Sequence, residues 1–257
     1  MRIVIKVGTS TLAHPTGLLN IRRVSRLCEV MSDLKNAGHE LVLVSSGAIG
    51  MGAGKLSLGG RPADMPTKQA AAAVGQCELM YTYDKLFTEH NHTVAQVLLT
   101  ADDVQHPQRE RNVHNTLTRL LELGALPIVN ENDTVATEEI AIGDNDTLGA
   151  IVAVAVQADL LILLSDIDGL YTADPHKDPH ARLLPVVEGI TPQIRAMTGG
   201  AGSAAQEAMS AVSDKPAPSI ASAVIRGKTL IAADPEEHMD ALMDSAPQVM
   251  ESLRNGR

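Results

Sequence analysis

Short apolar runs alternate with segments of helical periodicity along most of the chain. Runs rich in valine, isoleucine and leucine predict strands at residues 2–7, 40–44, 93–99, 126–129, 159–164 and 229–232. Helical patterns lie between the strands, at residues 20–37, 66–90, 109–123 and 147–156. Strands that alternate with helices in this way predict an α/β fold, in which an open parallel sheet is covered by helices on both faces.

The first strand carries a lysine, Lys6, close to its carboxyl end and just before the turn Gly8-Thr9-Ser10. A lysine in a buried strand is costly unless its ammonium group meets an anion. Backbone N–H groups of the glycine turn can cradle phosphate oxygens, so this strand end is a candidate anion site. The alternative is a lysine on an edge strand, with its side chain facing water.

The second strand opens into Ser45-Ser46-Gly47 and a glycine-rich stretch that continues to residue 52. We expect residues 45–52 to form a loop that is followed by a helix. A strand, a glycine-rich loop and a helix in that order are typical of anion sites at a helix N-terminus. The glycine pattern alone is a weak signal, and the prediction depends mainly on its position at the carboxyl end of a strand.

Two clusters of short acids and amides lie at residues 130–133 and 143–146. The first cluster is expected to end the strand at residue 129, because its residues are typical of turns and too polar for a core. Such side chains, held on loops by a rigid scaffold, can bind an ammonium group or order lysines around a phosphate. Two ordinary Asn/Asp turns are the alternative interpretation.

Composition narrows the classes of partner. The chain of 257 residues has a formal net charge of −10 and only 2% aromatic residues, which argues against nucleic acid as a ligand. No apolar run has the length of a membrane span and no leader pattern follows Met1, so we expect a cytoplasmic protein without membrane contact. Cys28 and Cys77 lack the spacing of a metal site or a disulfide framework and are predicted to be buried thiols.

Five motifs follow one another along the chain: KVGTST, VSSGAIGMG, PIVNENDTV, IGDNDTLGA and LLSDIDGLYTADP. Together they resemble the amino acid kinase family, over a stretch from Met1 to about Gly200. The resemblance implies a three-layer α/β/α sandwich with an open, mainly parallel sheet. It also implies a single amino acid kinase domain over residues 1–257, without the C-terminal RNA-binding-like domain of many bacterial relatives.

Within the family, the motifs are most similar to those of members that phosphorylate the side-chain carboxylate of L-glutamate, the first step of proline biosynthesis. The resemblance implies ATP and Mg²⁺ as cofactors and proline as a feedback inhibitor. It implies catalytic roles for Lys6 and Asp146, substrate binding by Ser46, Gly47, Asp133 and Asn145, and nucleotide binding by Lys6, Gly8, Thr9, Ser165 and Asp166. No side chain is assigned to a metal ion.

The segment near residues 203–215 departs from the family pattern. Relatives carry G-T-G-G-M-x-T-K there, a lid over the nucleotide that supplies a second catalytic lysine, whereas residues 205–212 share only Met209 with it. Val212 stands at the lysine position, and Lys215 lies nearby but just before prolines. Two further functions therefore stay open: a catalytically impaired relative that senses glutamate or proline, or a kinase for another small acid.

Small residues fill the first half of the helix predicted at residues 66–90. The stretch 68–76 is rich in alanine, and small side chains let helices pack closely, either inside a subunit or between subunits. We therefore expect a homo-oligomer, a dimer or a tetramer, whose substrates are small molecules.

Overall fold

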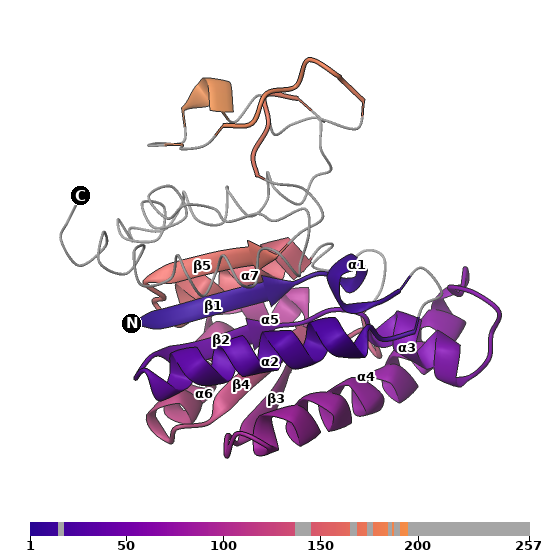
Figure 1. The fold of residues 1–257 in the computed structure, drawn as a ribbon, viewed down its shortest axis with the longest axis horizontal. Helices are drawn as coiled ribbons and strands as arrows, with labels where there is room; N and C mark the ends of the chain where they lie inside the picture. Colours follow the sequence, from indigo (N-terminus) through magenta and orange to yellow (C-terminus); the bar gives the residue numbers. More distant parts are fainter. Residues whose placement is uncertain are drawn as a thin grey trace.

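The computed structural model describes residues 1–14, 18–136, 145–164, 169–173, 177–184, 187 and 191–194. Within these residues, five parallel strands form one sheet in the order β3-β4-β2-β1-β5 (Figure 1). The strands are β1 (Arg2–Val7), β2 (Glu40–Val44), β3 (Val94–Leu99), β4 (Leu126–Glu131) and β5 (Leu160–Leu164). β1 lies inside the sheet, between β2 and β5, and nearly all of its residues are buried.

Helices of the described residues cover both faces of this sheet, so the fold has three layers (Figure 1). They are α1 (Thr9–Leu12), α2 (Ile21–Asn36), α3 (Ala48–Lys55), α4 (Met65–Thr88), α5 (Ala101–Gln105), α6 (Pro107–Glu122) and α7 (Asn145–Ala155). Apolar residues of α2 and α4 pack with Ile3 and Ile5, whereas those of α6 and α7 pack with Val4 and Val42 on the opposite face. The predicted three-layer α/β/α sandwich with a parallel sheet is confirmed.

The carboxyl ends of all five strands lie at the same end of the sheet, because the strands are parallel. In open parallel sheets, ligands bind next to these carboxyl ends. The turn after Val7 and the turn after Val44 leave the sheet there. The start of α7 reaches the same end, since the Asn145 side chain contacts Ser45. The topology thus gathers motifs that are far apart in the sequence.

The predicted strands at residues 2–7 and 40–44 have the predicted bounds. The other predicted elements within the described residues differ from the structure by at most two residues at either end. The strand predicted at residues 229–232 lies outside the described residues. Local periodicity is therefore sufficient to predict the positions of most helices and strands among the described residues.

The glycine-rich stretch after β2 differs from its prediction, because residues 48–55 form helix α3 instead of a loop. Glycine is a poor helix former, but here its missing side chain allows close packing between helices. A Cβ atom on Gly52 would lie 1.7 Å from the carbonyl oxygen of Ala71, and one on Gly75 would lie 1.8 Å from that of Ala48. The small residues of α4 therefore serve packing inside the subunit.

The two cysteines have different environments. Cys28 on α2 is buried, as predicted, and burial raises the pKa of its thiol. Cys77 on α4 is exposed, so the prediction of a buried thiol is wrong there. It directly follows the buried residue Gln76, and adjacent positions on a helix face different directions.

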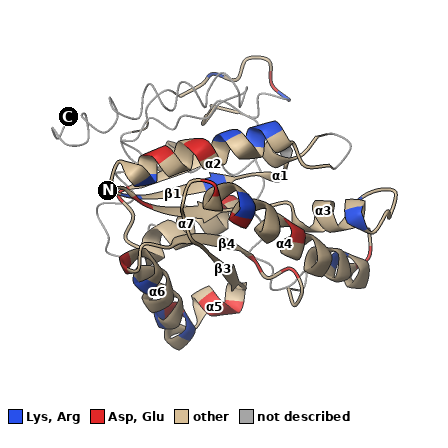
Figure 2. Ribbon diagram, turned by 60° about the horizontal axis from the view of Figure 1, so that its bottom comes forward, with Lys and Arg blue, Asp and Glu red and all other residues tan. Residues whose placement is uncertain are grey.

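Charged residues lie mainly on helices and loops (Figure 2). Acidic and basic side chains share the same helices, α2 and α6 among them, as expected for solvent-facing helix surfaces. None of the described helices combines the length and the apolar character needed to cross a bilayer. Lys6 differs from the charged helix residues because it is buried on a strand inside the sheet.

Candidate active site

Lys6 and Asp146 form an ion pair at the carboxyl ends of the strands. The Nζ atom of Lys6 lies 2.5 Å from Oδ1 of Asp146, which is in the first turn of α7. Lys6 is only 5% exposed, so the alternative of an edge-strand lysine facing water is wrong. A buried ammonium group needs an anion beside it, and Asp146 supplies one. The N-terminal end of α7 also favours the negative charge of Asp146.

The turn after β1 lies against the N-terminal end of α3. Gly8 has an extended backbone (φ −82°, ψ 163°) and precedes α1, whose first residue is Thr9. Gly47, the N-cap of α3, has a φ of 99°, which favours glycine. A Cβ atom on Gly47 would lie 3.7 Å from Cγ2 of Thr9. The predicted phosphate turn and the predicted substrate loop are therefore neighbours.

The side-chain amide of Asn145 joins α7 to the ends of β2 and β4. Its Nδ2 atom lies 2.7 Å from the carbonyl oxygen of Ser45 and 2.6 Å from Oγ of Ser46. The same Nδ2 lies 3.1 Å from Oδ1 of Asn130. Two predicted substrate-binding residues, Ser46 and Asn145, are thus in direct contact although they are 99 positions apart in the sequence.

Asn130 belongs to β4, contrary to the prediction that polar residues end this strand at residue 129. Its side chain is buried and hydrogen-bonded at both ends: Nδ2 donates to Oε1 of Gln76 at 2.9 Å, and Oδ1 accepts from the N–H of Glu131 at 2.9 Å. A buried amide with these partners is compatible with a strand. Asn130 belongs to the predicted cluster at residues 130–133 but was expected in a turn, whereas its partner Gln76 was not predicted as a site residue. The one available signal was an amide directly after an apolar run.

Asp133 lies in the turn that follows β4, at the end of the sheet where the other site residues gather. Burial, assisted by the negative charge of Glu131, raises the pKa of Asp133 to about 6, while the positive charge of Arg61 opposes this shift. A carboxylate whose ionised form is disfavoured gains from a positively charged ligand. Asp133 therefore has the property needed to bind an ammonium group.

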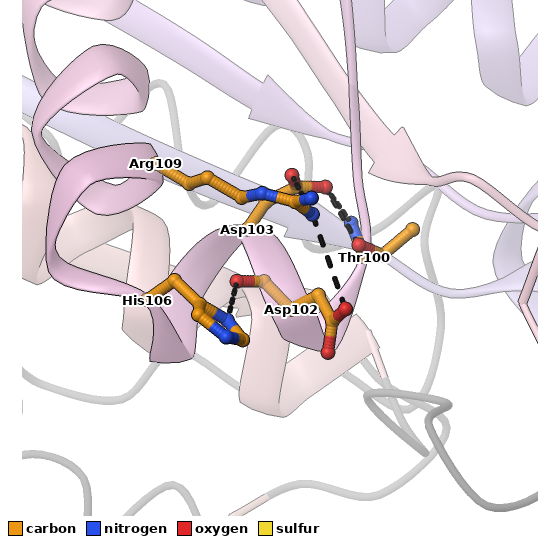
Figure 3. A network of polar contacts seen from close by, with 5 residues as sticks. All are labelled: Thr100, Asp102, Asp103, His106 and Arg109. Atoms are coloured by element: carbon orange, nitrogen blue, oxygen red, sulfur yellow. Dashed lines mark hydrogen bonds and ion pairs between the residues drawn. The ribbon is translucent and has the colours of Figure 1, made fainter.

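A polar network lies at the end of β3, between α5 and α6 (Figure 3). Thr100 caps α5: its backbone N–H and its hydroxyl donate to Oδ2 of Asp103 at 2.8 and 2.6 Å. Arg109 of α6 lies 3.5 Å from Asp103 and 3.9 Å from Asp102. The Thr100–Asp103 contacts cap the start of α5, and the exposed Arg109 links α5 to α6 by ion pairs at the surface.

Two groups of predicted residues lie outside the described part of the chain: Ser165 and Asp166 of the nucleotide site, and the segment near residues 203–215. The structure brings Lys6 to Asp146, Thr9 to Gly47, and Ser46 to Asn145. Among the described residues, no group of three or more His, Cys, Asp or Glu side chains is arranged to hold a metal ion.

Comparison with known proteins identifies the family. A model described as the amino acid kinase family matches residues 1–220. A glutamate 5-kinase from Listeria welshimeri is 55% identical over 206 residues, covering 79% of this chain and 75% of that protein. Glutamate 5-kinases from Carboxydothermus hydrogenoformans and Moorella thermoacetica are 54% and 56% identical over 204 and 202 residues. Both of these matches cover 79% of this chain but only 55% and 53% of the relatives, about half of their length.

Among solved structures, the chain is similar to the isopentenyl phosphate kinase of T. acidophilum in a product complex. The TM-score is 0.50 at 18% identity, and the match covers 74% of this chain and 80% of that one. At this identity the likeness concerns the fold alone, and it agrees with the parallel sheet described above. Since the family model covers most of the sequence and the relatives share more than half of the matched residues, this chain belongs to the amino acid kinase family.

Proposed function

We propose that this chain is a kinase that transfers the γ-phosphoryl group of ATP to the side-chain carboxylate of L-glutamate. The product is glutamyl 5-phosphate, an acyl phosphate, and the reaction is the first step of proline biosynthesis. The observation that carries the proposal is the ion pair between buried Lys6 and Asp146 at the carboxyl ends of the strands. The relatives named glutamate 5-kinase, which are between 54% and 56% identical, support the choice of substrate.

Phosphoryl transfer needs positioning and charge neutralisation more than covalent catalysis. A carboxylate oxygen of glutamate attacks the γ-phosphorus, the bond to the β,γ-bridging oxygen breaks, and ADP leaves with that electron pair. Both reactants are anions, so the ammonium group of Lys6 neutralises charge on the group that passes between them. Asp146 holds that ammonium group in place. No enzyme nucleophile takes part.

The proposed glutamate site consists of Ser46, Gly47, Asp133 and Asn145. Asp133 binds the α-ammonium group, since the raised pKa of its carboxyl group makes a cationic partner favourable. The N–H groups at the start of α3, which follow Gly47, suit a carboxylate of the substrate. The contact between Ser46 and Asn145 keeps the two halves of this site together.

The proposed nucleotide site begins at the turn after β1. The N–H of Thr9 binds an ATP phosphate, Gly8 shapes the turn while its own N–H donates to the carbonyl oxygen of Leu164, and Ser165 and Asp166, which follow β5 in the sequence, also bind the nucleotide. Bound to the ATP phosphates, Mg²⁺ would supply further neutralisation of their negative charge. The described residues offer no cluster of three or more metal ligands, so no side chain is assigned to the ion.

The proposal is tested by following ADP release from the purified protein with ATP, Mg²⁺ and L-glutamate. Hydroxylamine, which converts an acyl phosphate into a hydroxamate, separates glutamate phosphorylation from plain ATP hydrolysis. Aspartate, one methylene shorter, is the matched control substrate. Glutamate-dependent ADP release with an equal amount of hydroxamate is the expected result.

Two other results would support the alternatives that arise from the divergent segment near residues 203–215. Thermal stabilisation by glutamate or proline without any turnover would indicate a catalytically impaired relative that acts as a sensor. Turnover with a different small acid only would indicate a kinase of the same fold with another substrate. Either result contradicts the proposed glutamate kinase activity.

Three further properties belong to the same proposal. Proline acts as a feedback inhibitor, the chain forms a dimer or a tetramer, and it works in the cytoplasm, where ATP and glutamate are available. Addition of proline to the ADP assay tests the first property. Light scattering tests the second, and fractionation of cells that express a tagged chain tests the third.

A further inference from the structure

A chain of side-chain amides, of which Asn130 and Gln76 are buried and Gln96 is exposed, runs from the proposed glutamate site to α4 and β3. Asn145 donates to Asn130, and Nδ2 of Asn130 donates to Oε1 of Gln76 at 2.9 Å. Nε2 of Gln76 in turn donates to Oε1 of Gln96 at 3.5 Å. Gln76 is 7% exposed and Asn130 is 1% exposed, so water cannot easily replace these partners.

The chain of amides has a single direction. An amide donates through its nitrogen and accepts through its oxygen, so turning over Asn130 or Gln76 would set like groups against each other. Both ends of the Asn130 amide are held, its oxygen by the N–H of Glu131 and its nitrogen by Gln76. The arrangement therefore determines which end of Asn130 faces Asn145.

The carbonyl oxygen of Ser45 and Oδ1 of Asn130 both accept from the Nδ2 end of Asn145, and together they determine which end of this amide faces outward. Its Nδ2 is directed at three oxygens, those of Ser45, Ser46 and Asn130. Oδ1 is on the other side of the planar amide and therefore points away from these oxygens. An outward carbonyl oxygen is an acceptor, and an acceptor at this position suits an ammonium group.

We propose that Gln76 is a positioning residue for the amino-acid substrate, because it holds the Nδ2 end of Asn130, and Asn130 together with Ser45 orients the acceptor end of Asn145. This inference rests on the proposed function, since it adds a residue to the glutamate site. Gln76 acts through the two asparagines and takes no part in the chemical step.

Stability alone does not account for a glutamine at this place. The buried neighbours of Gln76 at helical spacing on α4 are Ala72, Leu79 and Tyr83, of which the first two are apolar. A glutamine on this buried face has to be desolvated, whereas an apolar side chain of the same size would carry no such cost. Its hydrogen bond to Asn130 gives the polar group a function at the end of β4.

The test compares Gln76→Met, Gln76→Glu and Tyr83→Phe with the parent chain. Met keeps the length of the side chain but accepts no strong hydrogen bond, so the KM for glutamate should rise about five- to tenfold. The KM for ATP should change by less than about twofold, because Lys6 is not in the amide chain. Glu keeps an acceptor oxygen for Asn130 and should return the KM for glutamate to within about threefold of the parent value.

Tyr83→Phe is the matched control on the same buried face of α4. It removes the hydroxyl that is hydrogen-bonded to Oγ of Ser45 at 2.9 Å and leaves the amide chain intact. We expect a loss of melting temperature similar to that of Gln76→Met, with the KM for glutamate changed by less than about twofold.

Equal KM values for glutamate in Gln76→Met and Tyr83→Phe would overturn the inference while leaving the proposed function intact. If the parent chain binds glutamate without turnover, only the proposed kinase activity is contradicted, and the inference on Gln76 can still be tested. In that case the same variants are compared by the rise in melting temperature that glutamate induces. We expect Gln76→Met to show a smaller rise than Gln76→Glu, Tyr83→Phe and the parent chain. A parent chain that neither turns over nor is stabilised by glutamate overturns both.

Discussion

Gly149 of α7 lies directly against the side chain of Lys6. A Cβ atom on Gly149 would be 3.2 Å from Cβ and 3.5 Å from Cγ of Lys6. The same helix carries Asp146 one turn earlier, so α7 both pairs with the ammonium group of Lys6 and supports its aliphatic stem. The absence of a side chain at Gly149 is therefore part of how the lysine is positioned.

Gly149→Ala should lower kcat about tenfold, because the stem of Lys6 must move by a few tenths of an ångström. The melting temperature should change little, since the better helix propensity of alanine, about 1 kcal/mol, offsets the tighter contact. Steady-state kinetics and thermal denaturation measure the two effects. Gly54→Ala, where the added Cβ would meet Leu18 at an ordinary 3.8 Å, is the control and should leave kcat unchanged. An unchanged kcat in Gly149→Ala would show that this contact does not position Lys6.

Lys6→Ala should reduce turnover far more than stability. Loss of a group that stabilises charge in the transition state typically costs about 10²- to 10³-fold in kcat. The remaining carboxylate of Asp146 is 31% exposed at a helix N-terminus, where its charge is tolerated. ADP release and thermal denaturation of the variant give the comparison. Intact turnover with a large melting loss would contradict the catalytic role.

The raised pKa of Asp133 predicts a pH dependence of glutamate binding. Its ionised form is needed for the ammonium group, so the KM for glutamate should rise as the pH falls below about 6. One pH unit lower, about a tenth of the carboxyl groups stay ionised, which gives an increase of about tenfold. The measurement is the KM for glutamate between pH 7.5 and pH 5, with the KM for ATP as the internal control. A KM for glutamate that is flat over this range would remove Asp133 from the site.

The same pKa has a defined effect on stability in the absence of ligand. The folded-state pKa of about 6 lies above the ordinary value of 3.8, so folding favours the protonated carboxyl group. This contribution is fully present below about pH 4 and is lost as the pH rises through about 6. Asp133→Asn should flatten the stability profile in this window, as measured by urea denaturation at several pH values. A profile equal to that of the parent would contradict the shift.

Gly52→Ala should destabilise the chain strongly. The added Cβ would lie 1.7 Å from the carbonyl oxygen of Ala71, so α3 and α4 must separate. Overpacking of this kind costs about 1–3 kcal/mol or more, which lowers the melting temperature of a chain of this size by several degrees. Gly50→Ala is the matched control on α3, because its Cβ would meet nothing within 4 Å. Equal melting temperatures for the two variants would show that the helices separate without cost.

Residues 205–212 depart from the lid motif that the family resemblance implies at this position. Replacing Glu207 and Ala208 by glycine and Val212 by lysine restores the family pattern at these positions. If this segment covers the nucleotide as in relatives, the triple variant should have a higher kcat than the parent chain. ADP release under saturating glutamate and ATP measures the change. An unchanged rate would mean that these positions are not equivalent to the glycines and lysine of the family motif.

The site was predictable from the sequence where one residue conflicts with its surroundings. Lys6 is a charge inside an apolar strand, and this conflict pointed to an anion; the structure provides Asp146 as that anion. The cluster at residues 143–146 was recognised as a candidate because it directly precedes the apolar helical pattern at residues 147–156. By contrast, Asn130 follows an apolar run as an ordinary turn residue would, and nothing nearby in the sequence indicates that it is buried.

The amino-acid sequence by itself determined the alternation of strands and helices, since periodicity depends on residues only a few positions apart. Only the tertiary structure decided that β4 continues through Asn130 and that residues 48–55 are helical. The amide of Asn130 is satisfied by Gln76, 54 positions away, and α3 is packed against Gly75 and Ala71 of another helix. Whether a polar or a glycine residue is tolerated inside an element depends on such distant partners, because they supply the hydrogen bonds and the close contacts that offset its cost.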